Sequence, residues 1–138
     1  MPNLRVFAQR MRERGKSIEE RGGKLIGDTL VNIAEGVIPH TPIKEGRARR
    51  NWQANKSTPL TTYLDAPSTP PDGEREAISN AKSVASKLKS GDAAHLTNNA
   101  PYIAELNRGS STQAPAMFVQ TEVLKALERI RDFKLIVK

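Results

Sequence analysis

The protein has 138 residues, a length that fits one domain with a single core. Only 37% of the residues are apolar and 4% are aromatic, so we expect a thin core and part of the stability from subunit contacts. The lack of cysteine excludes disulfides and thiolate metal sites. The N-terminus has no apolar signal-peptide run, and no stretch approaches the ~20 apolar residues that span a bilayer. We therefore expect a soluble protein, made in the cytoplasm, without a membrane partner.

The net charge of +7 is unevenly distributed along the chain. Residues 1–56 carry 12 Lys and Arg against 6 Asp and Glu, a balance of +6, and residues 57–138 carry 10 against 9, a balance of +1. A basic half of this kind is typical of a protein that binds a polyanion, either nucleic acid or an acidic protein partner. A solvated basic face on a soluble protein is an equally good interpretation.

A long helix is expected over residues 3–37, with Asn3 as its N-cap. Apolar and small residues recur at spacings of three, four and seven, which places on one stripe Leu4, Phe7, Met11, Ile18, Leu25, Thr29, Leu30, Ile33 and Val37. The opposite face is basic and includes Arg12 and Arg14.

Glycines and prolines are expected to divide and end this helix. Glycine costs about 1 kcal/mol in a helix interior, so the pair Gly22-Gly23 is a candidate for a kink or a break. We expect residues 24–36 to pack on the core, and the part before Gly22 to project and be covered by a neighbouring subunit. Pro39 and Pro42 should end the helix, because proline lacks an N–H and clashes with the preceding turn.

A turn and a strand are expected next. Lys44-Glu45-Gly46 has the composition of a tight turn with Gly46 at positive φ. Residues 47–56 form a strand candidate in which Trp52 and Ala54 share a face.

The middle of the chain combines a loop with a second helix. Residues 57–73 are rich in proline, serine and threonine and predict an extended loop, in which a short strand at 61–64 is possible. Residues 74–89 carry a helical apolar stripe, and Gly91 is a stop signal just beyond them.

The next segment alternates short elements with turns. A short strand is expected over residues 93–98, followed by a turn that contains Pro101 and Tyr102. One helical turn is possible over residues 102–106, and Gly109, like Gly46, is expected at positive φ in the turn that follows.

The last part of the chain predicts a third helix and an edge strand. Pro115 fits the first turn of a helix that runs to about Arg131, with an apolar stripe of Phe118, Val119, Val123, Leu124, Leu127 and Ile130. Residues 133–138 alternate weakly. The order of elements predicts one α+β domain over residues 1–138, with helices packed on a small antiparallel sheet.

No catalytic constellation can be assembled from the sequence, so we expect a protein that is not an enzyme and has no metal or cofactor. Only His40 and His95 could act as bases near neutral pH, and both are better explained as surface or packing residues. The sequence contains no metalloprotease, nucleophile-elbow or phosphate-loop motif.

The best candidate for nucleic-acid contact is the basic cluster Arg47, Arg49 and Arg50 beside Trp52. The arginines would contact phosphates and the indole could stack on a base. Alternation in the strand favours the simpler interpretation that Trp52 is buried and Arg49 points outward.

Two segments together resemble a known family. Residues 38–52 contain Thr41-Pro42, a turn ending in Gly46, then Arg49 and Trp52. Residues 98–118 read N-N-A-P-Y-I-A-E-L-N-R-G and then Q-A-P-A-M-F. Their order and spacing resemble the small tail-component family of lambdoid long-tailed bacteriophages, whose pattern is TP-x-D-T-G-x-L-R-x-S-W, N-x-x-P-Y-A-x-x-x-E-x-G and Q-x-P-x-x-F.

This chain departs from the family pattern at three places. It has Lys44-Glu45 where Asp-Thr is usual, Ala48 where Leu is usual, and Asn107-Arg108 before Gly109 where an acidic residue is common. The turn glycines Gly46 and Gly109 are retained.

The resemblance implies a structural protein of the virion head–tail junction, assembled in the host cytoplasm. Such a neck or tail-completion subunit would form a ring, a hexamer or a dodecamer, between the connector and the tail-tube or tail-terminator proteins. DNA in the channel would be a further partner. The contacts to DNA or to a partner would come from Arg47, Arg49, Arg50, Arg12 and Arg14. A small basic nucleic-acid-binding protein is the alternative.

Overall fold

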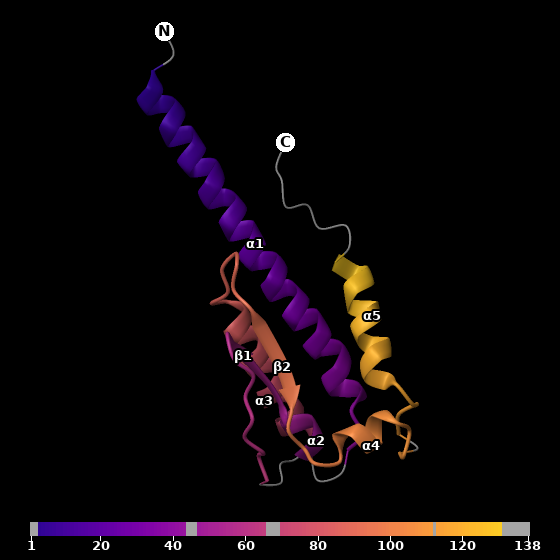
Figure 1. Ribbon diagram of the computed structural model, residues 1–138. Coiled ribbons are helices and arrows are strands. Elements are labelled where there is room, and N and C mark those ends of the chain that lie inside the picture. Colours follow the sequence, from indigo (N-terminus) through magenta and orange to yellow (C-terminus); the bar gives the residue numbers. More distant parts are fainter. Residues whose placement is uncertain (1–2, 44–46, 66–69, 112, 131–138) are drawn as a thin grey trace.

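The fold is α+β, with one long helix, shorter helices and a two-stranded antiparallel sheet (Figure 1). The computed structural model describes residues 3–43, 47–65, 70–111 and 113–130. The predicted turn at Gly46 and the predicted strand at 133–138 lie outside these residues. In chain order the elements are α1 (Leu4–His40), α2 (Arg47–Arg50), β1 (Trp52–Lys56), α3 (Pro70–Ala85), β2 (Ala94–Asn98), α4 (Ile103–Asn107) and α5 (Phe118–Ile130).

The helix α1 runs unbroken through its glycines, so the expected kink or break is wrong. Asn3 caps its start, as predicted, by accepting a hydrogen bond from the Arg5 N–H at 3.0 Å. Gly22, Gly23 and Gly27 instead face the end of α3 and the turn after it. A Cβ atom on Gly27 would lie 2.9 Å from the carbonyl oxygen of Ala85, so the lack of a side chain is what lets the two helices approach.

The prediction that Pro39 ends α1 is also wrong, because Pro39 lies inside the last turn. The carbonyls of this turn are bonded by side chains that come from further along the chain. Thr41 donates its hydroxyl to Val37 O at 2.8 Å, and Arg49 donates to Pro39 O at 2.6 Å and to Thr41 O at 2.8 Å. These bonds satisfy the acceptors that a helix end leaves open, so one further turn containing proline is stable.

The predicted strand over residues 47–56 is correct only in its second half. Arg47–Arg50 is a helical turn, and β1 begins at Trp52. It pairs antiparallel with β2, with Trp52 opposite Asn98. Trp52 and Ala54 share the buried face, as expected. The turn is fixed by Asn51, whose amide donates to Arg47 O at 2.8 Å and to Leu64 O at 3.0 Å.

The loop after β1 is shorter than predicted, and α3 starts at Pro70 and ends at Ala85 rather than spanning 74–89. The described part of the loop, up to residue 65, contains no strand, so the possible strand at 61–64 does not form. This part lies over the sheet through side-chain bonds. Asn99 and Thr97 both donate to Leu60 O, at 2.9 and 3.0 Å.

The third predicted helix starts later than expected. The helix α5 begins at Phe118, so Pro115 lies in the turn before it rather than in its first turn. Asn107, the last residue of α4, accepts hydrogen bonds from the start of α5. Val119 N–H donates to Asn107 Oδ1 at 3.1 Å, and Met117 N–H donates to Asn107 O at 2.6 Å. The short helix α4 and the strand β2 are close to their predicted places.

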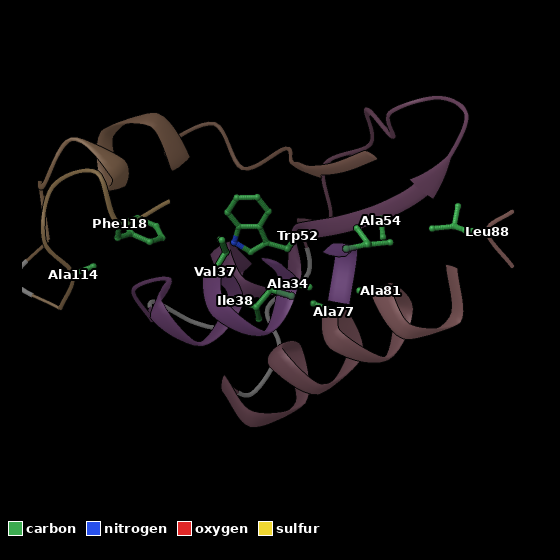
Figure 2. Packing of buried hydrophobic residues seen from close by; sticks show 11 residues of the cluster. Ala34, Val37, Ile38, Trp52, Ala54, Ala77, Ala81, Leu88, Ala114 and Phe118 are labelled. Carbon is green, nitrogen blue, oxygen red and sulfur yellow. The ribbon is translucent and has the colours of Figure 1, made fainter. Parts of the chain in front are cut away.

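The core lies where the C-terminal half of α1 meets the sheet, α3 and α5 (Figure 2). Alanines form much of the contact between layers, including Ala34 of α1, Ala54 of β1, and Ala77 and Ala81 of α3. Phe118 is the largest fully buried side chain. Because α5 turns Phe118, Glu122 and Ala126 inward, Leu124 and Leu127 are exposed, contrary to the predicted stripe.

Candidate functional site

Residues 38–52 and 98–118, the two segments singled out in the sequence, meet at one end of the molecule. Gln113 joins them through both atoms of its amide. Its Oε1 accepts from the Ile43 N–H at 2.7 Å, and its Nε2 donates to Ile43 O at 3.1 Å. Asn98 makes a second link by donating to Ala48 O at 2.8 Å. The polar residues of both segments therefore bond backbone groups across about 50 to 70 positions of sequence.

The predicted turn residues lie beside these links. Pro101 and Tyr102 form the turn that leads into α4, and Gly109 has the positive φ of +97° that was expected of it. Pro115 follows Gln113 in the turn before α5. A cavity of about 430 Å³ opens between the two segments, with Pro42, Ile43, Tyr102, Leu106 and Gln113 among its lining residues.

The arginines predicted to contact DNA or a partner are divided by the fold. Arg47, Arg49 and Arg50 lie on α2, not on a strand. Arg49 does not point outward as predicted: its side chain is 14% exposed, and its Nη1 donates to Glu74 at 2.8 Å. Arg50 pairs with Glu76 at 3.2 Å. Contact between Arg49 and a phosphate would require these internal bonds to break.

Arg12 and Arg14 are in a different environment, on the exposed N-terminal half of α1. Residues 4–21 of this helix, which we call the arm, extend beyond the sheet and α5 (Figure 1). The arm exposes apolar side chains whose exposed fractions are 79% for Leu4, 60% for Phe7, 52% for Met11 and 45% for Ile18. This is the projecting half that the sequence predicted.

The arm leads into an apolar groove that the sequence did not predict. The groove has a volume of about 530 Å³ and lies between α1, the sheet and α5. Its lining is Leu25, Ile26, Thr29, Leu30, Ile33, Val37, Trp52, Ala94, Leu96, Val119 and Val123. Among the described residues no charged side chain lines it, and Leu127 of α5 is 44% exposed. Periodicity could identify the α1 wall, but only the tertiary structure shows that two further elements leave it open.

The two histidines lie on different elements, His40 at the end of α1 and His95 on β2. His40 Nδ1 lies 2.6 Å from Gly36 O, and its Nε2 lies 3.6 Å from the buried carboxylate of Glu122. His95 Nε2 lies 3.2 Å from Ser57 O at the sheet. In the described part of the chain no three His, Asp or Glu side chains gather to hold a metal ion.

Comparisons with protein-family models, with curated proteins and with solved structures found no match to this chain. Within the described ranges, none of the helices combines the length and apolar character needed to cross a membrane.

Proposed function

We propose that this protein is a structural subunit of the head–tail junction of a long-tailed bacteriophage. It would form a ring, a hexamer or dodecamer, between the connector and the tail-tube or tail-terminator proteins. In this role it is not an enzyme, and its location is the virion.

The observation that supports this role most strongly is the junction of the two family-like segments. Gln113, Asn98 and Asn107 bond backbone atoms, and Arg49 completes the end of α1. Residues used in this way preserve a shape, which is what a ring subunit requires of its sequence.

The apolar surfaces of the chain support a protein that functions in an assembly. A soluble monomer rarely exposes a long apolar stripe next to an open apolar groove, and such surfaces mark protein interfaces. The arm and the groove both have this character.

The test is a null mutation of this gene in a phage that encodes it. The expected result is DNA-filled heads and complete tails that accumulate separately, with joining restored by the purified protein. Electron microscopy of the restored junction should show the protein as a ring. Normal virions from the null mutant would contradict the proposal.

A second candidate, a small basic nucleic-acid-binding protein, is favoured by the exposed arginines of the arm rather than by α2. It predicts that the affinity for duplex DNA falls steeply with salt concentration. The double variant Arg12→Gln, Arg14→Gln should flatten that dependence, whereas Arg75→Gln, at the exposed start of α3, should not. An affinity that is independent of salt would exclude this candidate.

A further inference from the structure

The arm stripe and the groove lie on the same face of α1. At about 100° per residue, Leu4, Phe7, Met11 and Ile18 fall within one narrow sector, and Leu25 and Thr29 of the groove fall in the same sector. The apolar face of α1 therefore extends from the tip of the arm to the groove, and at Gly22 the side chain of Ser90, in the turn after α3, lies against it. The face is about 50 Å long at 1.5 Å per residue.

The arm has little cover from the described part of its own chain. It has 18 residues and packs its N-terminal part on no other described element. An isolated helix of that length is marginal in water. The arm cannot fold back into its own groove, because both belong to one unbroken helix.

We infer that the free protein is a two-fold dimer in which the α1 helices of two copies pack antiparallel, each arm lying in the groove of the other copy. The two surfaces share one face and one helix, so an antiparallel pair brings each arm over a groove and leaves neither surface uncovered. Contact of the same surface on both copies is what two-fold symmetry requires. This inference concerns the free protein and does not depend on the proposed neck function.

A head-to-tail arrangement does not suit these two surfaces. In a ring, each subunit binds one neighbour with one side and the next neighbour with the other side. Here the arm and the groove face the same way, so an arm that faces one neighbour places its own groove toward that neighbour too. The dimer would therefore have to open before a ring is built.

The register follows from the sizes of the side chains. In an antiparallel pair of helices, the residue numbers of two facing positions have a nearly constant sum. With a sum of about 41, Ile33 of the groove lies opposite Ala8 of the partner's arm, and Ile26 lies opposite Gly15. A Cβ atom on Gly15 would meet nothing within 4 Å in its own chain, so there is room for a side chain of the partner. Large residues opposite small ones allow the helices to approach closely.

The area agrees with this pairing. A strip 50 Å long and about 10 Å wide gives on the order of 500 Å² of projected contact on each copy, or about 1,000 Å² in total, which is the lower limit for a specific interface.

Cross-linking through introduced cysteines tests the inference, because the chain has none of its own. The variants are Met11→Cys on the arm, Thr29→Cys in the groove, and the double variant. A short bismaleimide is added at a concentration where sedimentation shows the dimer. Each single variant should remain uncross-linked, and an equal mixture of the two should give a cross-linked dimer. The double variant should stop at the dimer.

Other results would overturn the inference. A ladder of trimers and larger species from the double variant would mean head-to-tail contact. Cross-linking of Met11→Cys alone would mean that arms pair with arms. A monomer at every concentration would mean that the groove is free or is covered by its own chain. None of these results bears on the null-mutant test of the neck role.

A matched pair of charge variants provides a second readout. Met11→Glu places a carboxylate on the open face and should weaken dimerisation at least tenfold. Gln9→Glu adds the same charge on the opposite face of the arm and should leave the dissociation constant within about twofold. Equal effects of the two variants would also contradict the inference.

Discussion

At the scale of single residues, two of the buried polar side chains of this protein bond the backbone. Thr41 and Asn51 are fully buried. Thr41 accepts the indole N–H of Trp52 at 2.8 Å while it donates to Val37 O. Because an unpaired polar group in the interior costs about 1–3 kcal/mol, each of these side chains is as important to the fold as an apolar residue of its size.

Arg49 should therefore be a stability residue. The change Arg49→Met keeps much of the aliphatic stem but removes the bonds to Pro39 O, Thr41 O and Glu74. We expect a loss of about 2–3 kcal/mol in the free energy of unfolding, measured by urea denaturation. The control Arg75→Met removes a side chain that is 75% exposed and should change it by less than about 0.5 kcal/mol. Similar midpoints for both variants would contradict this role.

Gly109 should tolerate no β-branched residue. Its φ of +97° is strained for any side chain, and a Cβ atom would lie 3.1 Å from the Cβ of Ala116. Gly109→Val should lower the free energy of unfolding by about 1–3 kcal/mol. In the monomer, Gly15→Ala, in open space on the arm, should not lower it. An unchanged melting temperature for Gly109→Val would show that this turn can relax.

At the scale of elements, the turn between α3 and β2 is held by one carboxylate. Asp92 accepts the Lys89 N–H at 2.7 Å and lies 3.2 Å from Lys56 of β1. The backbone hydrogen bond from Lys89 is the main cause that lowers the pKa of Asp92, and Lys56 adds to it.

This turn should loosen in acid. Because the pKa of Asp92 is lower in the folded protein, its contribution is complete above the pKa of the unfolded chain and is lost as the pH falls through the folded value. An NMR titration of the carboxyl carbon should give a midpoint below the usual value of 3.8. In Lys56→Met the midpoint should rise towards it. A midpoint at or above 3.8 in the parent protein would contradict the assignment.

The arm is the element with the least support from its own chain. At concentrations where the protein is monomeric, amides of residues 8–18 should exchange within seconds, whereas those of the buried half near Ala34 should be protected. Raising the protein concentration should slow exchange in the arm if a second copy covers it. If the amides of the arm were as protected as those of the buried half at every protein concentration, this prediction would be wrong.

At the scale of the whole molecule, unfolding should occur in two steps at low concentration. Trp52, the only tryptophan, is 7% exposed and packs where α1 meets the sheet. Its fluorescence therefore reports the part of the molecule outside the arm, which we call the body. The arm contributes helix but no tryptophan. On heating, far-ultraviolet circular dichroism should lose amplitude before the Trp52 emission shifts. Coincident transitions would mean that arm and body unfold as one unit.

The sequence by itself determined the features that depend on local pattern. The long helix with Asn3 as its cap, the shared face of Trp52 and Ala54, and the positive φ of Gly109 were all predicted correctly. Periodicity and turn chemistry are properties of neighbouring residues, so they are visible without the fold. The projecting stripe of the arm, which is half of the candidate site, belongs to the same class.

Only the tertiary structure decided the features that depend on residues far apart in sequence. The low helix propensity of glycine predicts a break at Gly22 and Gly23. In the structure the lack of a side chain at these positions lets the segment after α3 pack against α1. Pro39 stays helical because Arg49 bonds its carbonyl. The groove is open because α5 and the sheet flank α1 without meeting over it. For the glycines and for Pro39, a contact from another element outweighs a local preference of about 1–3 kcal/mol, and no local pattern contains that contact.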